Sequence, residues 1–257
     1  MLLRVRVTLP DRPGALGQVA RTLGVAGADI VQVVVLERLG GRAVDDFTVV
    51  WPGASRVERL LAGLGAIPGV QVDGVWKAIG APVSGGHDAE LLAQIAANPA
   101  DGLATLVDAV PALLAADWAA AVVVPPDWAA RSSGAPRPLP HEPAPSLSHE
   151  PALPLGGEAV TVCASWRAPS PMRLPEVTPL RARPMTGPDG TRYAVAPFGR
   201  AGLVLALART AENDDLPGAA FHVTEVDRVA QLVRAAAVIL GDRLDAAVAP
   251  PVVIERS

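Results

Sequence analysis

Residues 9–30, LPDRPGALGQVARTLGVAGADI, constrain the fold more than any other part of the chain. Just before them, apolar and polar residues alternate from Leu3 to Leu9, a period of two that predicts a strand with one buried face. Pro13 has a fixed φ that suits the first turn of a helix, and Asp11 is placed to cap that turn. A helical stripe then follows at Leu16, Val19, Ala20 and Leu23. The stretch therefore predicts a strand, a turn and a helix in direct succession.

The turn between this strand and this helix is the main candidate functional feature. Gly14 has no Cβ, so another group can approach its backbone closely. The free N–H groups and positive dipole end of the helix suit a carboxylate. An ordinary strand-to-helix turn with a capping aspartate accounts for the same local pattern, so both interpretations stay open at this point.

The next segment predicts two more strands. Residues 30–36, IVQVVVL, are apolar on both faces, so we expect a second domain or a second subunit to cover the face that local helices leave open. Gly40-Gly41 predicts a hairpin turn into a strand over residues 42–51. Asp45 and Asp46 are adjacent in that strand and point to opposite faces, and we interpret them as solvated residues.

A second helix and a fourth strand complete the first 80 residues. Ser55 and Glu58 have the spacing of a capping box, and an apolar stripe follows over residues 57–64. Residues 70–79 predict a strand in which Gly74 suits a bulge. The order β-α-β-β-α-β predicts a ferredoxin-like α+β domain, a four-stranded antiparallel sheet with both helices on one face.

This order, the DRPGAL turn of residues 11–16 and the GADI segment of residues 27–30 resemble the ACT domain, a regulatory module that often senses amino acids. The resemblance covers residues 1–80, and the chain as a whole resembles actinobacterial-type ACT-domain regulatory proteins. It implies pairing between subunits, and an effector bound where the first turn faces the start of the second strand. The ligand-binding residues that it implies are Asp11, Arg12, Pro13, Gly14, Ala15, Leu16, Asp29 and Ile30.

The sequence departs from this family at two of those positions. Many amino-acid-binding members have Asn where this chain has Asp11 and Asp29. Asn both donates and accepts hydrogen bonds, whereas an ionised Asp only accepts. Two aspartates therefore suit an ammonium group and oppose a carboxylate.

Composition divides the rest of the chain into a linker over residues 81–87, a second domain over residues 88–242 and a tail over residues 243–257. Within the second domain, residues 125–157 are rich in proline, which is typical of a flexible insertion. The tetrapeptide HEPA occurs there twice, at residues 141–144 and 149–152. Imidazole and carboxylate are metal ligands, but a flexible loop does not preform a site, so we predict none.

The second domain predicts helices around residues 91–95 and 103–110, then strands, then a long final helix. The strands are expected at residues 119–124, 158–166, 178–183, 191–197 and 202–209. We expect Thr224 and Asp227 to cap the final helix.

The segments LVDAVPALLAADWAAAVVV and YAVAPFGRAGLVLALAR, with FHVTEVDRVAQL after them, resemble the GAF domain. This regulatory fold is an antiparallel sheet with helices on one side; some members bind small molecules and others only dimerise. The charged NKFDE-type signature of cyclic-nucleotide-binding members is absent from the sequence, so the GAF-like half is degenerate and has no assigned ligand.

Composition and motifs argue against several functions. The net charge of −4 argues against a nucleic-acid partner, and no apolar run approaches the roughly 20 residues that span a bilayer. Cys163 is the only cysteine, so neither an intrachain disulfide nor a thiolate metal cluster can form. No phosphate-binding loop, nucleophile elbow or zinc-protease motif occurs. We expect a cytoplasmic protein without catalytic residues, metal or cofactor.

Three functions remain open. The first is a regulatory protein that binds an amino acid or a similar effector at a subunit interface, and the ACT resemblance implies that it is a homodimer. The second is an interaction module without a ligand, which binds a partner protein or a second copy. The third is an enzyme with a pocket in the GAF-like half around Cys163, Trp166 or Tyr193.

Overall fold

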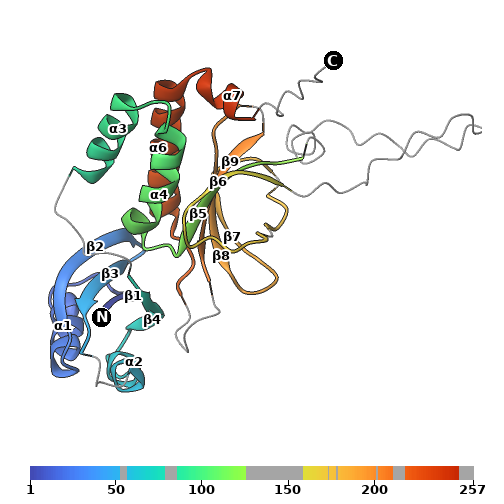
Figure 1. Cartoon of the computed structure of the whole chain (residues 1–257). Coiled ribbons are helices and arrows are strands. Elements are labelled where there is room, and N and C mark those ends of the chain that lie inside the picture. The colour runs from blue at the N-terminus through green and yellow to red at the C-terminus, as the bar shows by residue number, and fades with distance from the viewer. Residues whose placement is uncertain are drawn as a thin grey trace, which may run out of the picture.

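Two antiparallel sheets, each with helices on one face, make up the described part of the chain (Figure 1). The computed structural model describes residues 1–52, 57–78, 86–125, 159–172, 174–177, 179–200, 202–210 and 218–248. The fold is α+β, as predicted, and is consistent with an ACT-like, ferredoxin-like half followed by a GAF-like half.

The N-terminal half has the predicted β-α-β-β-α-β order. Its elements are β1 (Leu2–Pro10), α1 (Ala15–Val25), β2 (Asp29–Leu39), β3 (Arg42–Val50), α2 (Val57–Gly65) and β4 (Gln71–Lys77). The strands are arranged β2-β3-β1-β4, so β2 and β4 are the two edges of the sheet. Apolar side chains of β1 and β3 form a core with both helices on one face, which we name the inner face.

Helix α1 differs from the predicted stripe at its first turn. Ala15, Val19 and Leu23 are buried at a spacing of four, whereas Leu16 is 41% exposed. The helix ends at Val25, and Gly27, which follows the C-cap Ala26, has a φ of 88°. Such a left-handed residue allows the backbone to turn back, and the amide of Ala28 then donates to the carbonyl of Leu23 at 3.0 Å.

Two turns and one bulge also agree with the sequence. Gly40 and Gly41 both have positive φ and join β2 to β3 through the pair Leu39–Arg42, which is a two-residue hairpin. In β4, the pairing with β1 shifts between Gly74 and Val72, so the bulge lies at the predicted place. Ser55 of the predicted capping box lies outside the described residues, so the capping box stays a prediction.

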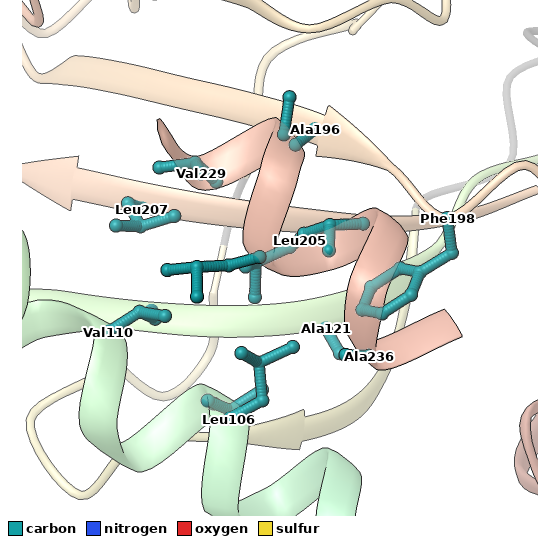
Figure 2. Packing of buried hydrophobic residues seen from close by; sticks show 14 of the residues in the cluster. Leu106, Val110, Ala121, Ala196, Phe198, Leu205, Leu207, Val229 and Ala236 are labelled. Atoms are coloured by element: carbon teal, nitrogen blue, oxygen red, sulfur yellow. The ribbon is translucent and has the colours of Figure 1, made fainter. Parts of the chain in front are cut away.

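The C-terminal half is a five-stranded antiparallel sheet in the order β6-β5-β9-β8-β7. Its elements are α3 (His87–Ala97), α4 (Gly102–Leu114), β5 (Trp118–Val123), β6 (Val160–Ala164), β7 (Arg183–Thr186), β8 (Arg192–Pro197), β9 (Leu203–Arg209), α6 (Val223–Leu240) and α7 (Arg243–Val248). Helices α3, α4 and α6 lie together on one face, and Figure 2 shows α4 and α6 packed on the strands through side chains such as Leu106, Leu205 and Val229.

Some expected boundaries differ from the structure. The strand expected at residues 178–183 instead forms as β7, beginning at Arg183. His222, not Thr224, caps α6, and Glu225 rather than Asp227 completes the capping box. Residues 243–248 of the expected tail form α7, in which Leu244 is buried. Most of the proline-rich segment and both HEPA motifs lie outside the described residues.

The second half packs against the outer face of the first sheet, which is the face opposite α1 and α2. Trp76 of β4 donates from Nε1 to the carbonyl of Ala115, at the end of α4, at 3.1 Å. The backbone approaches closely at Gly74, where an added Cβ would lie 2.7 Å from the amide nitrogen of Ala219. Glycine at position 74 is therefore what lets the segment before α6 lie directly on β4.

We predict that Gly74→Ala destabilises the protein by about 1–3 kcal/mol, because its methyl group overlaps the Ala219 backbone and forces the two halves apart. Thermal and urea unfolding of the full chain measure this. Gly24→Ala is the matched control: Gly24 lies in α1 with open space around it, and alanine there should stabilise by about 0.5–1 kcal/mol. Equal stability of Gly74→Ala and the wild type would contradict the close packing.

Candidate functional site

The turn from β1 into α1 has a different hydrogen-bonding pattern from the one predicted. Gly14 is the N-cap with φ 89°, and no side chain caps the helix, so the expected capping role of Asp11 is wrong. The Asp11 carboxylate instead accepts from Arg38 of β2, from Nη2 at 2.7 Å and from Nε at 3.1 Å. This ion pair lies at the surface and links the turn to the edge strand.

The first turn of α1 therefore keeps free backbone donors. The amide of Ala15 donates to the carbonyl of Arg12 at 3.2 Å, and the first regular helical bond runs from Gln18 to Gly14 at 3.1 Å. Among the described residues, the amides of Leu16 and Gly17 have no acceptor. Uncapped amides at the positive end of a helix are suited to an anion such as a carboxylate.

Asp29 and Ile30 lie far from this turn within one chain. Strands β1 and β2 are parallel, because both pair antiparallel with β3. Asp29 pairs with Val50 at one end of the sheet, whereas Asp11 follows Pro10, which pairs with Arg42 at the other end. The nine residues of β3 between these two partners separate the ends of the sheet by about 30 Å. A single chain thus brings together Asp11 to Leu16 but not Asp29 and Ile30.

Asp45 belongs to the neighbourhood of the turn, and sequence reasoning missed it. It is 3% exposed, so the predicted solvated position is wrong. Its register partners Val7 and Val35 place it on the inner face, and its Oδ1 atom has no hydrogen-bond partner among the described residues. Burial raises the pKa of Asp45; the charge of Arg38 opposes this increase, and the charge of Asp11 adds to it.

Asp46 is also buried, at 1% exposed, and points to the outer face. The guanidinium of Arg6 donates to both of its carboxylate oxygens, from Nε at 2.6 Å and from Nη2 at 2.8 Å. Arg4 pairs with Asp46 as well, at 3.1 Å. The predicted solvation of Asp46 is therefore wrong, because a strand-to-strand ion pair and the second half of the protein cover it.

The same Arg6 reaches the second half of the protein. Its Nη2 donates to Glu225 of α6 at 2.8 Å, and its Nη1 donates to the carbonyl of Ala220 at 2.6 Å. The other oxygen of Glu225 accepts from Arg209 of β9 at 2.6 Å. The Arg209 and Arg6 guanidinium groups both lie over the ring of Trp76, at 4.6 and 5.3 Å from its centre. We name Arg4, Arg6, Asp46, Arg209 and Glu225 the buried charge cluster.

Opposite charges decide the ionisation of Glu225. Burial alone would raise the pKa of this carboxyl, but attraction to Arg209 and Arg6 outweighs burial and lowers it to about 2. Arg209 also donates to the carbonyls of Leu114 and Ala115, at 2.7 and 3.0 Å. Each guanidinium thus has several acceptors, as a charge removed from water requires.

A second contact between the halves lies beside the turn. Glu37 precedes Arg38 on β2, and its Oε2 lies 3.1 Å from Nε2 of His222, the N-cap of α6. The other ring nitrogen, Nδ1, accepts from the amide of Thr224 at 3.3 Å. In that tautomer Nε2 carries the proton and donates to Glu37.

The residues considered for catalysis in the GAF-like half do not converge. Cys163 pairs with Ala121 and packs on the helix-covered face, whereas Tyr193 belongs to the cluster on the opposite face. Burial raises the pKa of the Cys163 thiol to about 11, so the thiol is protonated near neutral pH. Trp166 is exposed.

No family model and no curated protein matches the chain. Among solved structures, it is similar to a formyltetrahydrofolate deformylase from Pseudomonas putida KT2440, with 16% identity and a TM-score of 0.28 over 38% of this chain and 39% of that chain. It is also similar to an unknown protein from Galdieria sulphuraria, with 16% identity and a TM-score of 0.27 over 49% of this chain and 72% of that chain. The chain spans about two fifths of the deformylase's length.

Two further properties concern the described residues only. Their histidine, cysteine, aspartate and glutamate side chains form no group of three or more that could hold a metal ion. None of their helices has the length and apolar character needed to cross a membrane.

We predict that Glu225→Gln costs about 3–5 kcal/mol of unfolding free energy at pH 7, because it replaces the carboxylate that Arg6 and Arg209 share with a neutral amide. Urea unfolding of the full chain measures this cost. The folded-state pKa of Glu225 is lowered from 4.5 to about 2, so its contribution is present above pH 4.5 and lost as pH falls towards 2. The difference between variant and wild type should shrink over that range.

Asp245→Asn is the control for this prediction. Asp245 forms a surface ion pair with Arg200 at 3.0 Å, and surface pairs contribute only about 0–1 kcal/mol. A cost for Glu225→Gln no larger than that of the control would show that the buried charge cluster does not hold the halves together.

Proposed function

We propose that this protein is a non-catalytic regulatory protein whose N-terminal half binds a small metabolite with the chemistry of an amino acid. The observation that carries the proposal is the turn from β1 into α1, which presents uncapped amides at a helix N-terminus beside the charges of Asp11 and Arg38. A zwitterion needs donors for its carboxylate and an acceptor for its ammonium group, and the turn offers both. The resemblance of residues 1–80 to the ACT domain supports the same assignment.

A second copy of the chain supplies the other half of the site. Strand β2 is an unpaired edge that exposes Val31, Val33 and Val35 at 47, 39 and 51%. An antiparallel pairing of two β2 edges, centred near Val34, places Asp29 of the second copy beside Arg38. The homodimer therefore joins the turn of one copy to Asp29 and Ile30 of the other, which a single chain keeps apart.

The C-terminal half is the responding part. Strand β2 contacts it through Glu37 and His222, and β1 through Arg6 and Glu225. Binding acts on this half only if the ligand favours one of two arrangements of these contacts. Because Glu37 and Arg38 are neighbours, a shift of β2 at the turn moves the contact with α6 as well.

We predict that at least one of the twenty amino acids raises the melting temperature of the purified full chain by several degrees. A ligand at 100 times its Kd stabilises by about 2.7 kcal/mol. Asp11→Ala and Gly14→Val should abolish the shift, because the first removes the acceptor and the second puts a β-branched residue at a φ of 89°.

Asp73→Ala is the matched control for the ligand screen, because Asp73 is an exposed acid on the opposite edge strand, β4. It should leave the shift unchanged. If no compound shifts the wild type, the metabolite-binding function is overturned. If a compound shifts Asp11→Ala and Gly14→Val as strongly as the wild type, the ligand lies elsewhere in the protein.

The exposed β2 edge also supports a second function, an interaction module that uses the edge without any ligand. An edge strand with free backbone groups and apolar side chains pairs readily with another strand. Size-exclusion chromatography at several concentrations, with and without amino acids, separates the two functions. Tight association that no amino acid changes favours the interaction module.

Both functions predict that β2 is the dimer interface. We expect Val33→Lys to convert the dimer to a monomer, because a lysine on an edge strand opposes strand pairing. Sedimentation velocity over a hundredfold range of concentration measures the change. Val238→Lys replaces an exposed valine on α6 and should not alter assembly. A dimer that survives Val33→Lys would place the interface elsewhere.

A further inference from the structure

The carboxylate of Asp45 is buried, and no salt bridge with a described residue accounts for its position. It lies on the inner face between Val7 and Val35, and its Oδ1 atom is shielded from water without a hydrogen bond from any described residue. A buried acceptor without a donor costs free energy, and a buried charge without a partner costs more. A molecule that brings a donor to Asp45 would remove this cost.

The groups around Asp45 define what such a molecule carries. The charges that act on it come from Arg38 of β2, Asp11 of the turn and Asp46, its neighbour on β3. Arg38 is already paired with Asp11, and Asp46 is paired with Arg6 on the other face of the sheet. Among the described residues, Asp45 is thus the carboxylate of this neighbourhood that forms no salt bridge of its own.

We propose that Asp45 is the residue that binds the ammonium group of the ligand, and that the ligand is a zwitterionic α-amino acid. This inference rests on the metabolite-binding function proposed above. The ammonium group donates to Asp45, and the ligand carboxylate accepts from the amides of Leu16 and Gly17 and from Arg38. The site then offers an acceptor to the ammonium group and donors to the carboxylate.

Simpler ligands do not match this set of charges. A diamine satisfies Asp45 but faces Arg38 and the positive end of α1, which repel it. A carboxylic acid without an amine satisfies Arg38 and the helix amides but leaves Asp45 without a donor. A molecule that carries both charges, as an α-amino acid does, satisfies all of these groups at once.

The Arg38–Asp11 pair lies near Asp45, since the charges of both side chains act on its carboxyl. This pair is exposed, with the Arg38 side chain at 66% and the Asp11 side chain at 29%. Exposed ion pairs contribute little to stability, so a ligand that binds Arg38 through its carboxylate can open the pair at low cost. Opening it moves two of the three side chains whose charges act on Asp45, and it leaves Asp11 free to accept from the ammonium group as well.

The test compares Asp45→Asn with the wild type in the full chain. The probes are the twenty L-amino acids. Each is compared with the acid that lacks its α-ammonium group and with the amine that lacks its α-carboxylate. Isothermal titration calorimetry gives the Kd of every probe. For an amino acid that binds the wild type, Asp45→Asn should raise the Kd at least about 30-fold. The affinity for the acid without the ammonium group should change less than about twofold between the two proteins.

Asp73→Asn, the same substitution at an exposed position on β4, is the control and should leave every Kd unchanged. The melting temperature without ligand is the second measurement. Asp45→Asn should melt at or above the wild type at pH 7, because it removes a buried charge. A lower melting temperature, or failure to fold, would mean that the carboxylate is structural, and it would overturn the inference.

The outcomes separate this inference from the function on which it rests. If an amino acid binds the wild type and Asp45→Asn equally well, Asp45 does not bind the ammonium group, while the metabolite-binding function stands. If none of the twenty amino acids binds the wild type, both the inference about Asp45 and the metabolite-binding function are contradicted. If the acid without its ammonium group, or the amine without its carboxylate, binds the wild type as tightly as the amino acid does, the ligand need not be a zwitterion. That result would overturn the inference.

Discussion

The ion pairs between Arg6, Glu225 and Arg209 are the constraint on which the two-sheet arrangement depends. They link β1, α6 and β9 in a region closed to water, where each guanidinium needs several acceptors at fixed positions. An apolar interface tolerates some sliding, but forked donors on two-oxygen acceptors fix both distance and direction. The close approach of Gly74 to Ala219 has the same effect, because it allows contact only in one register. The second half is therefore held on the first in a defined orientation.

This docking decides which surfaces of the first sheet stay available. The helices cover the inner face and the second half covers the outer face, so the two edges and the turn into α1 remain. The edges differ in character. Strand β4 exposes Gln71, Asp73 and Lys77, which are polar, whereas β2 exposes a row of valines. Polar edge residues discourage strand pairing and apolar ones favour it, so β2 is the edge that suits a second copy.

Local rules were sufficient to predict the element order of the first half, but they missed helix α7 and could not predict the charge cluster. The periods of two and 3.6 gave the β-α-β-β-α-β order, and the paired glycines gave the hairpin. Arg4 and Arg6 have the alternation of a solvated strand face, and adjacent aspartates also suggest solvent. Their burial depends on Glu225, 219 residues away from Arg6 in the chain, which no local pattern contains. The separation of Asp29 from Asp11 likewise follows from sheet order, because parallel strands begin at the same end.

The alternation of side chains along β2 joins the proposed site to the second half. Arg38 pairs with Ala43 on the inner face and contacts Asp11, whereas Glu37 pairs with Val44 on the outer face and contacts His222. Adjacent residues in a strand must point to opposite faces, so a twist of β2 that moves one side chain moves the other. The pairing with β3 is irregular just before Glu37, where such a twist disrupts the fewest ladder bonds. A ligand that takes Arg38 from Asp11 therefore acts on the N-terminus of α6 through a single strand, without any change in either core.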